Sequence, residues 1–409
     1  MPPDPASDAA PSSGDRDPSR PLAGVRVLDL TTFLSGPVAA RTLADLGADV
    51  VRVEPPAGDP TRAGSGLHPG DPPSPFYLAL HRDRRGVVLD LKTEAGTGVL
   101  ADLIGVSDVL LENYRPGVTT RLGIAYEDVA SLNPRLVYCT ITGFGPDGPH
   151  SQFPATDGAV QAFGGVLELT GPVGGFGLPV PLPLADLVAG ATAAQGVLAA
   201  LLARARHGRG THVDISMLES LLGWLLVGDR ERTLAPPTTL VVEASDGESI
   251  LVQTSLHFAA RLATLLAEVP GCEPLVDDDR FATRPARQTN LEPYLALVRR
   301  AFRTRSSAEW LTALQTIGIP ASRIQPIDDA LSHSQLAHRD AVVDLDVPGL
   351  GRRTVLASPF RFDERRKTAT TPPPALGEHT ASVLRDLVGY DDTRVETLAR
   401  QGAFGDRAT

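Results

Sequence analysis

The sequence predicts an α/β protein with a mostly parallel, doubly wound sheet and a second, smaller α+β domain. Three observations lead to this prediction. Short aliphatic runs alternate with helical segments over the first half of the chain. The chain has 409 residues, of which 42% are hydrophobic, so it exceeds one ordinary domain and can bury a large core. The alternation breaks near residue 226, where a polar, Pro-containing stretch begins.

The alternation opens with a strand, a helix and a second strand. Residues 25–30 are typical of a strand, and residues 37–46 are typical of a helix that has Pro37 near its start. Gly47 ends this helix, and residues 48–54 form the next strand. Further strands are expected at 86–91, 108–112, 136–142 and 211–216. Helical segments separate the strands, which favours parallel pairing through helical crossovers.

Composition suggests the domain boundaries. Residues 1–20 are rich in Pro, Asp, Ser and Ala and are expected to form a disordered tail. The remaining prediction is a large domain over 21–225, a linker over 226–240, a small domain over 241–325 and a return to the large domain over 326–409. In the small domain, strands near 240–242 and 249–253 precede helices that continue to about residue 317.

Charge and cysteine content exclude several classes of protein. The 38 basic and 49 acidic residues give a net charge of −11, which argues against a nucleic-acid partner. Cys139 and Cys272 make no disulfide framework, and no His/Cys spacing indicates a metal site. No window predicts a membrane span, and the first residues lack the pattern of a signal peptide. We therefore expect a cytoplasmic protein without a metal.

Common catalytic motifs are missing from the sequence. It contains no GxSxG, P-loop or HExxH pattern. The opening strand–helix–strand unit is similar to the start of Rossmann-like dinucleotide-binding folds, in which Glu54 would bind a ribose. The turn from Asp29 to Pro37 lacks their glycine fingerprint, however, so we expect no nucleotide redox cofactor.

Asp186 is the most informative residue of the chain. It follows a Gly/Pro-rich stretch over 171–183 and opens an apolar segment over 187–205 that predicts a buried helix. Unpaired N–H groups at a helix start favour an ionised carboxylate by roughly 0.3–1 kcal/mol. Such a carboxylate in a cleft can act as a nucleophile or a base. The alternative is that Asp186 only caps its own helix.

Many short segments, in their order and spacing, resemble the class III CoA-transferase superfamily. This superfamily includes formyl-CoA transferase, L-carnitine CoA-transferase and α-methylacyl-CoA racemase. The longest matching segments are residues 21–30 and 43–54. Shorter ones are Ser35-Gly-Pro37, Gly58-Asp-Pro-Thr-Arg62, Glu112-Asn113, Thr142-Gly-Phe-Gly145, Val213-Asp214 and Leu376-Gly-Glu-His-Thr380. The matches extend from about residue 21 to 225 and from about 275 to 385.

The resemblance implies a Rossmann-like large domain, an interlocked homodimer and transfer of CoA from an acyl-CoA to a free carboxylic acid. It implies that Asp186 is the nucleophile and forms a mixed anhydride and then an aspartyl-CoA thioester. Asp157 is implied to orient the substrate, with helix capping as its alternative. Glycines within 174–177 are one possible source of oxyanion-stabilising N–H groups.

The resemblance also implies which residues bind CoA. They are Phe33, Leu89, Lys92, Asn113 and Arg121. Lys92 and Arg121 would contact the phosphates, and ordinary surface charge is the alternative for both. Phe33 and the neighbouring Leu34 suggest an apolar acyl pocket.

The sequence departs from the family at four places. Pro55 stands where relatives often have a basic residue near the nucleotide. Thr156 stands before Asp157, where racemases carry His and transferases carry Tyr, and a threonine is a poor second acid or base for racemisation. Leu34 replaces the Gln of formyl-CoA transferase, which disfavours an oxalate-like acceptor. The stretch before Ala244 is short compared with a segment that often covers the active site in relatives. A racemase-type isomerase and a non-catalytic CoA-binding paralogue therefore stay open as alternatives.

Overall fold

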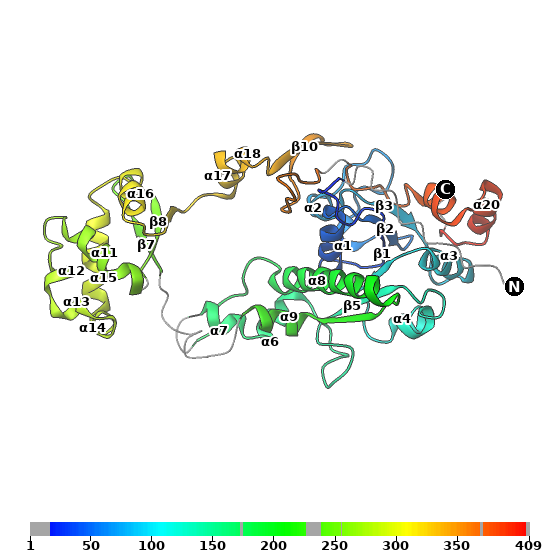
Figure 1. The fold of residues 1–409 in the computed structure, drawn as a ribbon, viewed down its shortest axis with the longest axis horizontal. Helices are drawn as coiled ribbons and strands as arrows, with labels where there is room; N and C mark the ends of the chain where they lie inside the picture. The colour runs from blue at the N-terminus through cyan, green and yellow to red at the C-terminus, as the bar shows by residue number, and fades with distance from the viewer. Residues whose placement is uncertain (1–16, 172–174, 226–238, 255, 369–370, 406–409) are drawn as a thin grey trace. The chain divides into compact units, whose positions relative to one another are not determined.

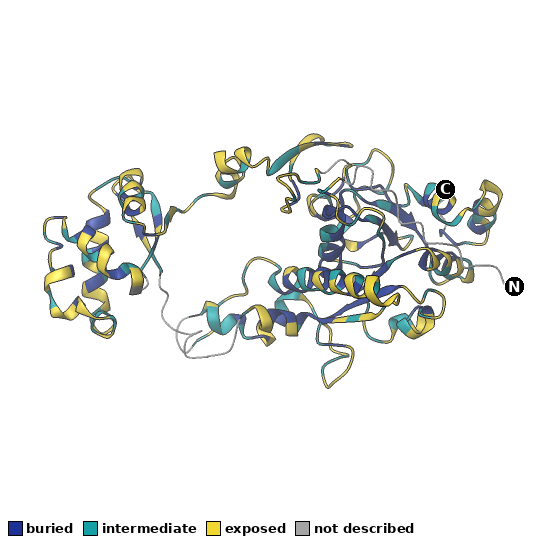
Figure 2. Ribbon diagram, viewed as in Figure 1, coloured by how far each residue is buried: buried dark blue, intermediate teal, exposed yellow. Residues whose placement is uncertain are grey.

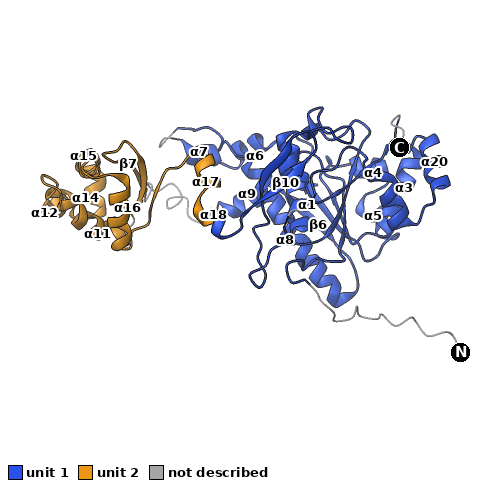
Figure 3. Cartoon of the chain, turned by 90° about the horizontal axis from the view of Figure 1, so that it is seen from above, with its two compact units in different colours: residues 1–228, 336–409 blue, residues 229–335 orange. Residues whose placement is uncertain are grey.

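The computed structural model of the chain describes residues 17–171, 175–225, 239–254, 256–368 and 371–405 (Figure 1). It contains two compact units, residues 1–228 with 336–409 and residues 229–335 (Figure 3). The first unit is assembled from both ends of the chain. The second unit extends beyond the small domain predicted over 241–325 on both sides.

Unit 1 is built on a six-stranded parallel sheet with the strand order β3-β2-β1-β4-β5-β6. The strands are β1 (Arg26–Asp29), β2 (Asp49–Glu54), β3 (Arg85–Val88), β4 (Val109–Glu112), β5 (Val137–Thr142) and β6 (His212–Ser216). This arrangement confirms the predicted doubly wound sheet. β3 ends three residues earlier than the expected strand over 86–91, because a turn begins after Leu89.

Helices cover both faces of this sheet, which explains the nearly continuous aliphatic sequence of its central strands (Figure 2). One face packs against α1 (Ser35–Asp45), α8 (Leu184–His207) and α9 (Met217–Trp224). The other face packs against α3 (Glu94–Gly105), α19 (Thr380–Val383) and α20 (Asp392–Arg400). The C-terminal segment therefore completes the core that the N-terminal segment begins.

The remaining elements of unit 1 are short. They are η1 (Pro60–Arg62), α2 (Pro75–His81), α4 (Val118–Leu122), α5 (Tyr126–Val129), α6 (Asp157–Phe163), α7 (Val166–Thr170), the hairpin β10 (Val342–Val347) and β11 (Gly351–Leu356), and η2 (Leu384–Val388). Helix α18 (Ser334–His338) contains the boundary between the units.

The predicted disordered tail lies only partly within the described residues. Residues 1–16 lie outside them, whereas Asp17–Arg20 form a hydrogen-bonded turn. Ser19 is buried there, and its N–H and hydroxyl both donate to Asp17 Oδ1, at 2.9 and 2.7 Å.

Unit 2 is the α+β part of the chain. Its antiparallel sheet contains β7 (Thr239–Glu243), β8 (Ser249–Gln253) and β9 (Ala321–Arg323). Its helices are α11 (Leu256–Ala267), α12 (Pro274–Asp277), α13 (Asp279–Ala282), α14 (Arg284–Thr289), α15 (Leu291–Phe302), α16 (Ser307–Thr316) and α17 (Ile327–Leu331). Trp310 is fully buried in this core and donates from Nε1 to Phe302 O at 2.8 Å.

Helix α8 is the longest described helix and is rich in Ala and Gly. By length and composition it could cross a membrane, which the sequence analysis did not anticipate. Its small residues are explained by close packing on α1, β5 and β6. A Cβ added at Gly190 would lie 2.5 Å from the backbone oxygen of Ser35, so the two helices touch through the main chain here.

Candidate active site

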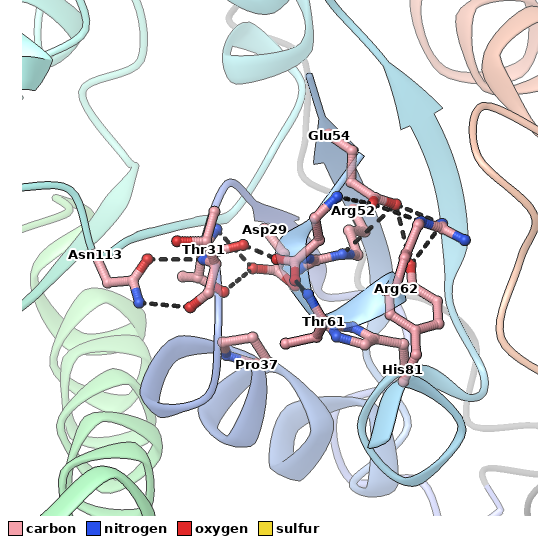
Figure 4. A network of polar contacts seen from close by, with 12 residues as sticks. Asp29, Thr31, Pro37, Arg52, Glu54, Thr61, Arg62, His81 and Asn113 are labelled. Atoms are coloured by element: carbon pink, nitrogen blue, oxygen red, sulfur yellow. Dashed lines mark hydrogen bonds and ion pairs between the residues drawn. The ribbon is translucent and has the colours of Figure 1, made fainter. Parts of the chain in front are cut away.

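The strand order of the sheet reverses between β1 and β4, and the loops that follow these two strands meet at its carboxyl edge. Ligands of open α/β sheets bind at this switch point. Asn113 follows β4, and Figure 4 shows it against the loop that follows β1. Its Oδ1 accepts from Thr32 N at 2.8 Å, and its Nδ2 donates to Thr32 O at 2.8 Å. Asn113 Nδ2 also lies 3.5 Å from Ser35 Oγ.

A buried ionic network holds the same loop from the other side (Figure 4). Asp29 Oδ1 accepts from the N–H and hydroxyl of Thr31, at 3.0 and 2.5 Å. Arg52 bridges Asp29 Oδ2 and Thr31 O at 3.2 and 3.1 Å, and Arg84 adds a bond to Asp29 Oδ2 at 2.9 Å. All three charged side chains are fully buried. The loop is therefore fixed by hydrogen bonds at both of its ends.

Glu54 belongs to this network and does not face a ligand. It is 1% exposed and accepts from Arg62 Nε and Nη2 at 2.8 and 2.7 Å and from Tyr77 OH at 3.0 Å. Burial raises its pKa, but hydrogen bonds from Arg62 and the charges of Arg52 and Arg62 outweigh burial and bring it to about 2. Both carboxylate oxygens of Glu54 already accept hydrogen bonds within the protein, so neither is free to bind a ribose.

Phe33 stands out in the β1–α1 loop. Its φ is +60°, a left-handed conformation that costs a non-glycine residue about 1–3 kcal/mol and is enriched at functional sites. Its side chain is 61% exposed, whereas that of Leu34 is 6% exposed. Of the two residues that suggested an apolar acyl pocket, only Phe33 offers its side chain to a ligand.

Asp186 lies in the first turn of α8, and another acid caps that helix. α8 begins at Leu184, and Pro183 at its N-cap provides no side-chain acceptor. Asp157, the first residue of α6, instead accepts from Ala185 N at 2.7 Å and from Asp186 N at 3.3 Å. Asp157 therefore caps α8, as its alternative role predicted. The carboxylate of Asp186 does not cap this helix.

Gln161 fixes Asp157 and the chain that leads into α8. It is fully buried, and its Nε2 donates to Asp157 Oδ2 at 2.7 Å and to Leu182 O at 3.1 Å. Its Oε1 accepts from Val180 N at 2.9 Å. Sequence reasoning assigned no role to Gln161, although its position four residues after Asp157 on one helix could have indicated the pairing.

The Asp186 carboxyl is partly buried, and its pKa is raised to about 6. Burial is the largest cause, and the negative charge of Asp157 adds to it. Hydrogen bonding by the hydroxyl and N–H of Ser35 opposes the increase. Asp186 is therefore ionised near neutral pH but poorly solvated, which is the state of an active carboxylate nucleophile.

The five residues implied to bind CoA all follow the carboxyl end of a strand, but they differ in exposure. Lys92 and Arg121 are exposed, on the loop after β3 and on α4. The Leu89 side chain is fully buried in the core, so only its main chain could meet a ligand. Within the described part of the chain, neither Lys92 nor Arg121 forms a hydrogen bond or ion pair with Asp186.

The glycines expected to supply oxyanion-stabilising N–H groups lie only partly within the described residues. Gly174 lies outside the described residues, and the N–H of Gly177 is already donated to Leu167 O at 2.7 Å. Gly177 is therefore not a free donor. The stretch before Ala244, expected to be shortened, falls mostly on residues 226–238, which are also outside the described part of the chain.

Two cavities lined by described residues lie away from Asp186. One of about 520 Å³ lies at the amino ends of β2 and β3 and is lined by Asp49 and Arg85. Another, of about 220 Å³, is lined by Glu112, Thr140 and His212 beside α4. Burial raises the pKa of Glu112 to about 7. Asp186 lines neither cavity.

The chain is similar to known proteins over most of its length. Residues 22–380 match the sequence model of the family described as CoA-transferase family III. The chain is 30% identical to succinyl-CoA:glutarate CoA-transferase of Mus musculus, covering 97% of this chain and 93% of that protein. It is 32% identical to a probable fatty acyl-CoA transferase of Mycobacterium tuberculosis, covering 90% and 98% of the two chains.

Solved structures extend the likeness to the fold. A crystal structure of a CAIB/BAIF family protein from Brucella suis superimposes with a TM-score of 0.78 and is 30% identical, covering 90% of this chain and all of that one. The family match spans most of the chain, and the structural match includes both halves of unit 1. The chain belongs to the family III CoA-transferases.

Proposed function

We propose that this CoA-transferase moves CoA from an acyl-CoA thioester to a free carboxylic acid through a covalent thioester on Asp186. The observation that carries the proposal is the state of Asp186. Its carboxylate lies in the first turn of α8 and is partly buried. Asp157, and not Asp186, caps this helix. A carboxylate in this state is free to attack an acyl carbon.

The proposed reaction balances without an added acid, base or metal. An oxygen of ionised Asp186 attacks the thioester carbon, the C–S bond breaks, and CoA leaves as a thiolate with a mixed anhydride left behind. The thiolate attacks the Asp186 carbonyl carbon and expels the first acid as its carboxylate. The acceptor carboxylate then attacks this aspartyl thioester, and the released thiolate takes the new acyl group. Asp186 is regenerated as a carboxylate.

The CoA moiety would be recognised at the carboxyl edge of the sheet. Lys92, on the loop after β3, and Arg121, on helix α4 after β4, are exposed cations, so they can meet phosphates. Phe33 presents an exposed ring in the loop that ends at Ser35. The M. tuberculosis and mouse relatives are named for fatty acyl and succinyl donors, so both chemistries belong in the substrate panel.

A trapping experiment tests the covalent step. The protein is mixed with a panel of acyl-CoAs and hydroxylamine, which converts an aspartyl thioester to a hydroxamate about 15 Da heavier than the acid. We expect wild type to gain this mass at Asp186 and Asp186→Ala to gain none. Asp328→Ala, at an exposed acid in the first turn of α17, is the matched control and should behave as wild type.

The outcomes separate the alternatives. No adduct with any acyl-CoA that binds would overturn the covalent mechanism. Deuterium uptake at the α-carbon of an acyl-CoA without any acceptor acid would indicate a racemase-type activity instead.

We also propose a cytoplasmic homodimer, as the resemblance implies, and light scattering on the full chain tests the dimer.

A further inference from the structure

We infer that Ser35 is a further catalytic residue, whose hydroxyl and N–H hold the Asp186 carboxylate, and that Asn113 is the residue that positions Ser35. This inference rests on the proposed role of Asp186 as the nucleophile. It also changes the role of Asn113, which the resemblance alone assigned to CoA binding.

The packing of α1 on α8 brings the two residues together. A Cβ at Gly190 would lie 2.5 Å from Ser35 O and 2.7 Å from Val38 Cβ, so this face of α8 lies directly on the start of α1. Asp186 precedes Gly190 by one helical turn. Residues four apart share a face of a helix, and side chains lean towards the helix start. Asp186 is thereby directed at the first turn of α1.

The first turn of α1 lacks the groups that usually satisfy a helix start. It contains no acidic residue, and Leu34 at its N-cap provides no side-chain acceptor. The N–H of Ser35 therefore has no partner within the helix. A carboxylate supplied by α8 meets this need and is favoured by the helix dipole. The effect of Ser35 on Asp186 agrees with this, because donors from Ser35 lower the pKa of Asp186 and so favour its ionised form.

Asn113 sets which way the hydroxyl proton of Ser35 points. Its Oδ1 is occupied by Thr32 N, and one Nδ2 hydrogen by Thr32 O, both at 2.8 Å. The other Nδ2 hydrogen is available to Ser35 Oγ at 3.5 Å. Because Oγ accepts there, the hydroxyl proton of Ser35 is free to point at Asp186. Ser35 is 4% exposed, so water does not compete strongly for that proton.

This arrangement serves the reaction at two stages. It first holds one oxygen of the Asp186 carboxylate, which leaves the other to attack. In the mixed anhydride and later in the thioester, the same two donors face the carbonyl oxygen of the aspartyl group. Negative charge develops on this oxygen when the thiolate or the acceptor carboxylate attacks, and fixed donors stabilise it. Among the described residues, the charged group that affects the pKa of Asp186 is Asp157 of α6.

The test compares Ser35→Ala, Ser35→Thr and Asn113→Ala with wild type. Ser107→Ala is the matched control, because Ser107 is a buried serine in the connection between α3 and β4, and its hydroxyl donates to Leu103 O. The first measurement is the rate of hydroxylamine trapping from pH 5 to 8. The second is a titration of Asp186 by ¹³C NMR on aspartate-labelled protein, assigned by subtracting the Asp186→Asn spectrum and requiring no substrate.

We expect the wild-type inflection near pH 6 to move upwards by about one unit in Ser35→Ala, since one hydrogen bond to a charged group is lost. The plateau trapping rate should fall about tenfold for the same reason. Ser35→Thr keeps the hydroxyl and should restore the inflection. Asn113→Ala should move it in the same direction as Ser35→Ala, and Ser107→Ala should not move it.

The two measurements keep the inference and the proposed function apart. An NMR shift in Ser35→Ala without any trapped adduct in wild type supports the contact and overturns the covalent mechanism. A trapped wild-type adduct together with an unchanged inflection and plateau in Ser35→Ala overturns the inference. Should Ser35→Ala fail to fold, an unchanged inflection in Asn113→Ala overturns it instead.

Discussion

Asp157 caps the helix that presents Asp186, with its Oδ1 accepting the N–H of Asp186 at 3.3 Å and that of Ala185 at 2.7 Å. This contact has two effects on Asp186. The cap fixes the first turn of α8 and thereby the direction of Asp186. The charge of Asp157 also adds to burial in raising the pKa of Asp186. One acid thus orients the other and makes it harder to ionise.

We expect Asp186→Asn to stabilise the folded protein at pH 8. The folded pKa of Asp186, about 6, lies above its ordinary value of 3.8, mainly because of burial. The neutral form is therefore favoured in the fold, and its stabilising effect is complete below pH 4 and is lost as the pH rises through 6. Replacement by Asn should increase the free energy of unfolding by up to about 3 kcal/mol at pH 8 and by little at pH 4.

Urea unfolding of wild type and Asp186→Asn at both pH values measures this difference. Asp328→Asn, at an exposed acid in the first turn of α17, controls for the lost charge. A variant that is less stable than wild type at pH 8 would contradict the conclusion that Asp186 is held in an unfavourable ionised state.

Gln161→Ala should weaken both stability and the trapping reaction. The change leaves Val180 N and Leu182 O without their partner and removes the donor to Asp157. Unsatisfied buried groups cost about 1–3 kcal/mol each, so we expect a loss of at least about 2 kcal/mol in the free energy of unfolding. Gln315→Ala, on an exposed position of α16, is the control. Equal stability of the two variants would refute the role given to Gln161.

Gly190→Ala should separate α1 from α8. Its Cβ would lie 2.5 Å from Ser35 O, and neither backbone can yield without moving its helix. Overpacking of this kind costs about 1–3 kcal/mol, and the trapping rate at Asp186 should fall with it. Gly98→Ala, at an exposed position of α3 with open space around it, should instead stabilise by about 0.5–1 kcal/mol. Thermal unfolding of the pair distinguishes the two effects.

Glu54→Gln should remove part of the acid sensitivity of the fold. The folded pKa of Glu54, about 2, lies below its ordinary value of 4.5, because Arg62 and Arg52 outweigh burial. Its stabilising effect is therefore present above pH 4.5 and is lost as the pH falls towards 2. The variant should be less stable than wild type by up to about 3 kcal/mol at pH 7 and should approach wild type near pH 2. Urea midpoints across this range measure it, and a constant difference would exclude the ion pair as the cause.

The sequence determined the sheet and singled out Asp186 as the candidate central acid. Aliphatic strands alternating with helices predict a doubly wound sheet because only a core covered on both faces suits such strands. Asp186 could be identified because a lone acid opens a long apolar helix. The order of short motifs gave the family resemblance that the comparisons confirm.

Only the tertiary structure decided what surrounds that acid. Asp157 is 29 positions from Asp186 in sequence, and Asn113 is 78 positions from Ser35. Hydrogen bonds over such separations depend on the order of the strands and on the approach of α1 to α8 at Gly190. No local pattern encodes them. The sequence therefore predicted which residues are candidates for the chemistry, and the packing of the helices on the sheet decided which of them touch.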